Sequence, residues 1–153
     1  MKLKSLKKVL SMAWTKETCV PSLRDKWCKE NKELGQCAIT ALIVNDYYGG
    51  KIMRCMTSTG SHYYNLIDDN IVDLTVEQFA GEKPLYEEGQ ERTREYLLSD
   101  EDTKARYIML LKNVKSILDN RLICDSIEVE EIIEDFSKRR KRIERMKRHY
   151  DYE

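Results

Sequence analysis

The sequence lacks the features that mark secreted, membrane-spanning or broadly nucleic-acid-binding proteins. Lysine plus arginine and aspartate plus glutamate are balanced at 27 each among 153 residues, so the net charge provides no general attraction for nucleic acid or anionic membrane. No apolar run approaches the roughly 18 residues of a spanning helix, and lysines interrupt the apolar positions of the N-terminal segment. We therefore expect a cytoplasmic protein that neither enters a membrane nor takes nucleic acid as its main partner.

Cysteine and histidine are used in a way that narrows the chemistry. The five cysteines are an odd number without a C-x-x-C pair, which favours free thiols in a reducing compartment over a disulfide framework. Their spacing matches no common structural zinc pattern, so we expect no metal and no cofactor. Of the two histidines, His149 lies in a charged tail, which leaves His62 as the candidate for histidine-dependent chemistry.

Hydrophobic periodicity predicts an α+β domain. The most apolar stretch, residues 37–48, is longer than a typical strand and is followed by Gly49 and Gly50, which predicts a buried helix with a glycine C-cap. After the glycines, short β-rich runs alternate with turn residues and predict an antiparallel meander. The N-terminal half is predicted to contain helices over 3–14 and 37–48 and a short helix near 22–29, followed by strands over 51–56, 61–67 and 71–74. The prediction continues with a short helix opened by a capping box at Thr75, a loop with a short helix over 81–102, and a helix from Asp102 or Thr103 to near Asn120.

The C-terminal part of the chain has a different character. We divide the chain into a domain of residues 1–122 and a charged helical extension of residues 123–153, which is acidic at its start and basic at its end. The extension carries an apolar seam that suits self-association or partner binding through a helix, formed by Ile132, Ile133, Phe136, Ile143 and Met146. Its basic stretch, residues 137–150, has the composition of a nucleic-acid or lipid contact, but we favour a solvated helix end.

Three residues supply the parts of a cysteine-dependent acyl-transfer site. Such sites need a thiolate nucleophile, an imidazole that takes and returns a proton, and a polar group that orients the ring. Cys37 lies at the predicted N-terminus of the buried helix, where backbone N–H groups favour a thiolate and can receive an oxyanion. His62 lies in the second predicted strand and Asp73 in the third, so their side chains meet if the strand registers agree.

Simpler interpretations of the same residues stay open. A cysteine on a buried helix is more often a packing residue than a nucleophile. His62 fits a half-buried strand position, and Asp73 fits a cap for the helix that follows it. A zinc site from these three residues and another cysteine is the least favoured alternative.

Five short motifs stand in order along the chain. They are AW-x-x-ET (13–18), GQCA-x-TAL (35–42), DY-x-GG (46–50), SHY-x-N (61–65) and DLT-x-x-QF (73–79). Together they resemble the YunG family of small bacterial proteins over roughly residues 10–118, and residues 92–111 are similar to the family's C-terminal helical part. The tail from about residue 125 lies outside the resemblance. The resemblance implies a fold without naming a reaction.

The order of Cys37, His62 and Asp73 also resembles the papain-like and transglutaminase-like superfamily. That resemblance implies a papain-like fold, in which a Cys-bearing helix packs on an antiparallel sheet. It further implies a nucleophilic Cys37, a His62 that acts as general base and acid, and an orienting Asp73. Papain-like proteases carry an oxyanion glutamine several residues before the cysteine, whereas Gln36 is adjacent to it here. The oxyanion and substrate-binding candidates therefore stay open among Gln36, Asn31, the Cys37 backbone amide, Asn65 and Trp14, although we favour core packing for Trp14.

Two hypotheses of function follow. In the first, the chain is a cysteine hydrolase or acyl transferase that acts on a small amide, peptide or thioester, because a domain of this size has little room for a long cleft. In the second, Cys37, His62 and Asp73 form a non-catalytic buried polar network, and the extension of residues 123–153 acts by binding a partner.

Overall fold

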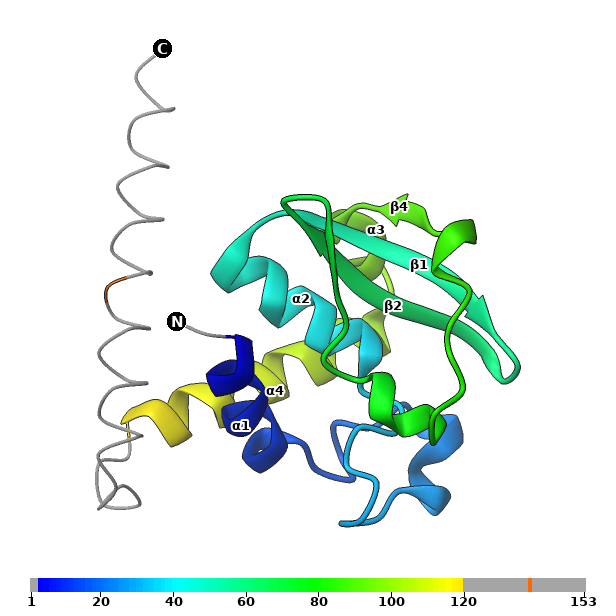
Figure 1. The fold of residues 1–153 in the computed structure, drawn as a ribbon. Coiled ribbons are helices and arrows are strands. Elements are labelled where there is room, and N and C mark those ends of the chain that lie inside the picture. Colours follow the sequence, from blue (N-terminus) through cyan, green and yellow to red (C-terminus); the bar gives the residue numbers. More distant parts are fainter. Residues whose placement is uncertain (1–2, 120–137, 139–153) are drawn as a thin grey trace.

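The computed structural model describes residues 3–119 and Lys138, and its elements form an α+β arrangement (Figure 1). A small sheet covers one side of a central helix, and two further helices cover the other side. The elements are α1 (Leu3–Ala13), η1 (Pro21–Lys26), α2 (Cys37–Tyr48), β1 (Lys51–Thr57), β2 (Gly60–Ile67), β3 (Asn70–Val72), η2 (Val76–Phe79), η3 (Tyr86–Glu88), β4 (Gln90–Arg92), α3 (Arg94–Leu98) and α4 (Glu101–Asp119).

Helix α2 is the central element, and its predicted bounds are confirmed. Six consecutive residues from Ile39 to Val44 are buried, because one side of the helix packs against α1 and α4 and the other against β1 and α3. The helix ends at Gly49, whose φ of 69° is the left-handed conformation that glycine adopts without strain. Gly50 is also required, since a β-carbon there would collide with the carbonyl oxygen of Leu66 in β2. The glycine pair therefore both ends α2 and lets the chain turn into the sheet.

The predicted meander is confirmed as strands β1, β2 and β3, but the sheet has a fourth strand that the sequence did not indicate. The strand order is β3-β2-β1-β4, and every neighbouring pair is antiparallel. Strand β4 is only three residues long and has no apolar side chain, so it lacks the alternation that would predict a strand. Strand β3 ends at Val72, which places Asp73 just after the strand and not within it as predicted.

Three local predictions need correction. Residues 76–79 form a 3₁₀ turn without the predicted capping box, because the Thr75 hydroxyl bonds to Asp73 and the Gln78 amide donates to the Thr75 carbonyl. The short helix expected near 22–29 is the 3₁₀ segment η1. Helix α4 begins at Glu101, earlier than predicted, since the Asp100 carboxylate accepts a hydrogen bond from the Thr103 N–H and caps it.

The C-terminal extension predicted over residues 123–153, with its apolar seam and basic stretch, lies outside the described residues apart from Lys138. The division at residue 122 therefore stays a prediction. Among the helices that the structure describes, none combines the length and the apolar character needed to cross a membrane.

Candidate functional site

His62 and Asp73 meet at the end of the sheet. Strand β2 pairs with β3 so that Asn65 lies opposite Val72, and continuing this register places Asp73 beside β2, diagonal to His62. The side chains join through a hydrogen bond of 2.5 Å between His62 Nε2 and Asp73 Oδ2. The His62 and Asp73 side chains are only 1% and 4% exposed, so this pair is shielded from water.

The Asp73 carboxylate is held by several donors. Oδ2 accepts a hydrogen bond from the Tyr86 hydroxyl at 2.8 Å as well as the bond to His62. Oδ1 accepts from the Thr75 backbone N–H at 3.0 Å and from the Thr75 hydroxyl at 3.3 Å. Both oxygens are thus occupied, which leaves Asp73 little freedom to move and fixes the plane of the imidazole.

The imidazole of His62 is enclosed on its other sides. The Phe79 ring packs edge-on against it, with the ring centroids 4.8 Å apart, and Cys55 of β1 lies opposite it in the strand register. The second ring nitrogen, Nδ1, is buried and has no hydrogen-bond partner within residues 3–119. A buried polar atom without a partner is costly, so its retention needs an explanation beyond packing.

The surroundings of His62 favour its charged form. Burial lowers the pKa of His62, but the hydrogen bond that the ring donates to Asp73, and then its interactions with the Cys37 side chain, outweigh burial and raise that pKa to about 9. The imidazolium is therefore the form present at neutral pH. Because Asp73 occupies Nε2, Cys37 is the neighbour left for Nδ1.

Cys37 is the first residue of α2, as predicted, and its side chain is partly exposed. Gln36, the residue before the helix, makes no side-chain cap to it, so its side chain leaves the first backbone N–H groups of α2 free for another acceptor. The other described cysteines differ from this one. Burial raises the pKa of Cys55 to about 11 and also raises the pKa of Cys19, while Cys28 is exposed in a loop. Cys37 alone among these four combines partial exposure with a neighbouring imidazolium.

The remaining predicted site residues either lie apart from Cys37, His62 and Asp73 or stabilise the elements that carry them. Gln36 is fully buried, and its amide donates to the Thr15 carbonyl at 3.0 Å, while its own Oε1 has no partner among the described residues. Asn65 donates to the Ala41 carbonyl at 3.0 Å and ties β2 to α2, on the strand face opposite to His62. Trp14 is a core residue, as favoured above, and its indole N–H bonds to Thr40.

Asn31 lies in a turn, where its backbone N–H donates to the Cys28 carbonyl. None of the hydrogen bonds or ion pairs of the described chain connects Asn31 to Cys37, His62 or Asp73. Likewise, no cluster of three or more metal-ligating side chains occurs within the described residues. The zinc alternative therefore finds no ligand set there.

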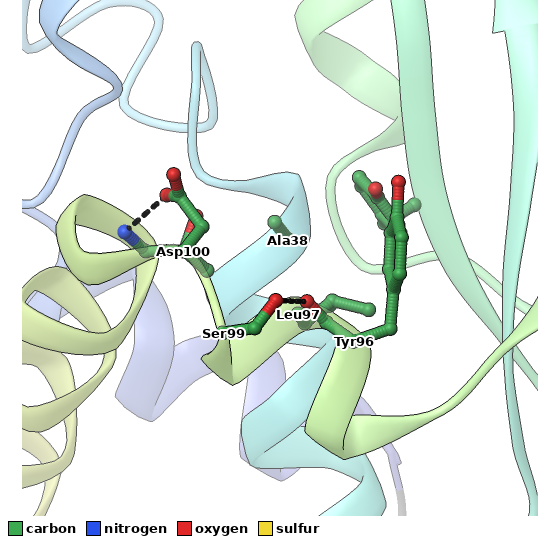
Figure 2. A pocket seen from close by; sticks show the side chains of 7 residues that line it. Ala38, Tyr96, Leu97, Ser99 and Asp100 are labelled. Carbon is green, nitrogen blue, oxygen red and sulfur yellow. Dashed lines mark hydrogen bonds between the residues drawn. The ribbon is translucent and has the colours of Figure 1, made fainter.

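A pocket of about 410 Å³ opens beside the start of α2 (Figure 2). Ala38, the residue after Cys37, forms part of its wall. The other walls come from β2, α3 and the start of α4, and are made by Tyr63, Tyr96, Leu97, Ser99, Asp100 and Thr103. Cys37 precedes Ala38 in α2, so the first turn of the helix joins the thiol-bearing residue to the pocket wall.

Sequence reasoning missed several residues of this region. Tyr86 and Phe79 approach His62 from segments with 3₁₀ geometry, whose positions depend on tertiary contacts and carry no periodic signal. The pocket residues of α3 and α4 were missed because the region around residues 81–102 was assigned to a loop with one short helix. The QF of the motif DLT-x-x-QF was the one available signal, since it placed Phe79 in the same motif as Asp73.

Comparison with known proteins agrees with the resemblance found in the sequence. Residues 2–119 match the family model described as YunG protein. The chain is also similar to the uncharacterized protein YunG of Bacillus subtilis (strain 168), with 34% identity over 74 residues, which cover 48% of this chain and 60% of that relative. No solved structure matches. Because the family model covers most of the chain, including α2 and the sheet, the protein belongs to the YunG family.

Proposed function

We propose that this protein is a cysteine-dependent hydrolase or acyl transferase with a papain-like catalytic arrangement. Cys37 is the nucleophile, His62 the general acid and base, and Asp73 the group that orients the imidazole. The observation that carries the proposal is the state of His62, whose Nε2 is held by Asp73 while the buried Nδ1 beside Cys37 has no hydrogen-bond partner in the described structure. A purely structural histidine would be expected to have both ring nitrogens satisfied.

The proposed reaction begins from a Cys37 thiolate and a His62 imidazolium. The thiolate sulfur attacks the carbonyl carbon of an amide or thioester, and the carbonyl electron pair moves to the oxygen. When the tetrahedral intermediate collapses, the bond to the leaving group breaks, and the Nδ1 proton of His62 passes to the departing amine or thiol. This step leaves an S-acyl group on Cys37 and a neutral imidazole.

The second half of the reaction restores the site. Neutral His62 takes a proton from a water molecule, whose oxygen attacks the S-acyl carbon, and the products are a carboxylic acid, the Cys37 thiolate and the imidazolium. In acyl transfer, an amine or thiol replaces water. The uncapped N-terminus of α2 supports backbone N–H groups of Cys37 and its neighbours as the oxyanion donors. The Gln36 side-chain amide is a second candidate, with one of its N–H groups already bonded to Thr15.

Size supports a small substrate. The pocket beside Cys37 has a volume of about 410 Å³, within the range of roughly 300–1,000 Å³ for small-molecule sites. A small amide, the end of a peptide or a small thioester fits such a volume. The alternative function through the C-terminal extension concerns residues outside the described structure.

Alkylation of Cys37 as a function of pH tests the proposal. We would treat the wild type, His62→Ala and Asp73→Asn with iodoacetamide and follow each cysteine by mass spectrometry. In the wild type, Cys37 should be alkylated at about pH 6 at least tenfold faster than exposed Cys28, because an ordinary thiol with a pKa of about 8.5 is almost fully protonated there. The advantage should disappear in His62→Ala and shrink in Asp73→Asn.

Cys28 and Cys55 serve as internal controls in every sample. Cys28 should react alike in all three proteins, and buried Cys55 should stay protected as long as the variants are folded. If Cys37 instead follows Cys28 at every pH, or reacts equally fast without His62, the three residues form a structural network and the catalytic proposal is wrong. A positive result would justify screening amide and thioester substrates against Cys37→Ser as the inactive reference.

A further inference from the structure

The pocket beside Cys37 has two chemically different ends. Asp100 lies on one side of Ala38 and Tyr96 on the other, with Leu97 and Ser99 between them (Figure 2). The Asp100 carboxylate is largely solvated, and one of its oxygens accepts the Thr103 N–H at 2.8 Å. Hydrogen bonds from the Thr103 N–H and the Thr103 hydroxyl, and then the nearby charge of Arg106, lower the pKa of Asp100, so the group carries a negative charge at neutral pH. The carboxylate is exposed, so its oxygens can accept a further hydrogen bond from a ligand.

Positive charge lies on the sheet side of the pocket. Arg54 of β1 is the register partner of Tyr63, and its buried Nε has no hydrogen-bond partner in the described part of the chain. The Arg92 guanidinium lies over the Tyr96 ring, 5.6 Å from its centroid. Asp100 is the charged side chain among the residues that line the pocket, and Arg54 and Arg92 lie next to its two tyrosines. Arg106, whose charge also acts on Asp100, is paired with Asp102.

This polarity selects the orientation of a charged ligand. A cationic group is repelled from the arginine side and attracted to Asp100, whose exposed carboxylate can accept its N–H. The tyrosine wall offers ring surface to the apolar part of the same ligand. Ala38 follows the proposed nucleophile directly in α2, and on this ground we assign the pocket to the acyl part of the substrate, which becomes attached to Cys37.

We propose that the pocket recognises an acyl group bearing a protonated primary amine, with Asp100 as the residue that binds the amine. The inference rests on the proposed function, because it assigns the pocket to the acyl side of the substrate. It narrows the substrate class to aminoacyl amides, aminoacyl thioesters and peptides that present a free N-terminus. Asp100 is a binding residue in this proposal and takes no part in the proton transfers of His62.

Binding to the full chain carrying Cys37→Ala tests this recognition without any turnover. The probes are phenylalaninamide and 3-phenylpropanamide, which differ in the amine alone. Titration followed by backbone amide NMR shifts should show about twofold to fivefold tighter binding of the amine-bearing probe, the range expected for a solvated ion pair. The shifts should include Ser99 and Thr103, which flank Asp100.

Two charge-removing variants in the Cys37→Ala background make the test specific. Asp100→Asn should abolish the preference for the amine and leave 3-phenylpropanamide binding unchanged, because asparagine still caps α4. Glu101→Gln removes one exposed charge from the next residue, which does not line the pocket, and should keep the preference. Equal binding of the probes, no binding of either at millimolar concentrations, or a preference that survives Asp100→Asn would overturn the assignment.

Failure here is distinguishable from failure of the catalytic proposal. If Cys37 is unreactive in the alkylation experiment but phenylalaninamide binding depends on Asp100, the proposed enzyme activity is wrong. The pocket would then bind an amine without binding a substrate of Cys37. If Cys37 is reactive but the two probes bind equally, the proposed enzyme activity is supported and substrates with an amine-bearing acyl group are excluded.

Discussion

The two ends of α2 both carry polar side chains, yet the groups are satisfied to very different degrees. At the C-terminal end, Arg94 donates to Asp46 at 2.9 Å and to the Leu42 carbonyl at 3.1 Å, and Tyr107 donates to Asp46 at 2.6 Å. At the N-terminal end, Nδ1 of His62 and Oε1 of Gln36 are buried without hydrogen-bond partners in the described structure.

This difference separates structural polar groups from candidate functional ones. The C-terminal network ties α2 to α3 and α4 with complementary charges, and burial and the hydrogen bond to Asp46 raise the pKa of Tyr107 to about 12, so it stays a neutral donor. At the N-terminal end, the two buried atoms without hydrogen-bond partners in the described structure lie in the same region as a partly exposed thiol and a pocket. Uncompensated polar atoms are expected where a ligand or a reaction completes them.

The largest predicted effect is the change in the free energy of unfolding when His62 loses its proton. Its folded pKa of about 9 lies above the ordinary value of 6.5, so the folded protein binds the proton more tightly than the unfolded chain. The resulting stability is fully present below about pH 6.5 and is lost as the pH rises through about 9. At 1.4 kcal/mol per unit, it amounts to at most about 3 kcal/mol.

Urea unfolding of the wild type and of His62→Gln at several pH values measures this contribution. The difference in the free energy of unfolding between the two proteins should shrink steadily between about pH 6.5 and about pH 9. The contributions of the thiols and tyrosines to the pH dependence cancel in this difference, because these groups titrate in both proteins. A difference that does not change over this range would mean that His62 is neutral in the folded protein and would weaken the proposed ion pair.

The next largest effect should come from Arg94→Met at the opposite end of α2. This substitution removes the Arg94 guanidinium from Asp46 and from the Leu42 carbonyl, and because the side chains of Arg94 and Asp46 are still between a quarter and a third exposed, we expect a loss of about 2 kcal/mol in the free energy of unfolding. Urea unfolding measures the loss. Cys37 alkylation should keep its pH profile, since the network lies at the far end of the helix.

Lys104→Met is the control for Arg94→Met, because it also removes one cation but from an exposed position on α4. Its effect should stay within about 0.5 kcal/mol. If Arg94→Met changed the Cys37 profile while the protein remained folded, the two ends of α2 would be coupled, and the separation drawn above would be wrong.

The sequence predicted the elements with local signals well. The apolar run and the glycine pair predicted the bounds of α2, and the change to period two predicted β1 to β3. These elements alone carry Cys37 and His62 and end beside Asp73. The three side chains could therefore be selected from their types and order, although strand register, which decides whether His62 meets Asp73, is a long-range property that sequence spacing does not determine.

The parts that could not be predicted depend on contacts between distant segments. Strand β4 exists because β1 offers it a free edge, and nothing in its sequence is strand-like. Tyr86 reaches Asp73 from a loop 13 residues further along the chain, and Asp100 reaches the pocket because it caps α4. Chemistry-bearing residues on irregular segments are thus the ones that sequence patterns miss.

Tyr86→Phe should have the smallest effect on the free energy of unfolding, and it tests which residues belong to the functional end of α2. The substitution removes one of four hydrogen bonds to Asp73 and leaves those from His62 and Thr75 in place, so we expect a loss of about 1 kcal/mol in urea unfolding. Since Asp73 still holds Nε2 of His62, Cys37 should keep its alkylation advantage at about pH 6, unlike in Asp73→Asn. Tyr96→Phe, which also removes a tyrosine hydroxyl but from an exposed side chain, is the matched control for the urea measurement. If the Tyr86→Phe protein is stable but Cys37 has lost its reactivity, Tyr86 positions Asp73 for the chemistry. The candidate functional residues at the N-terminal end of α2 would then include Tyr86 of η3.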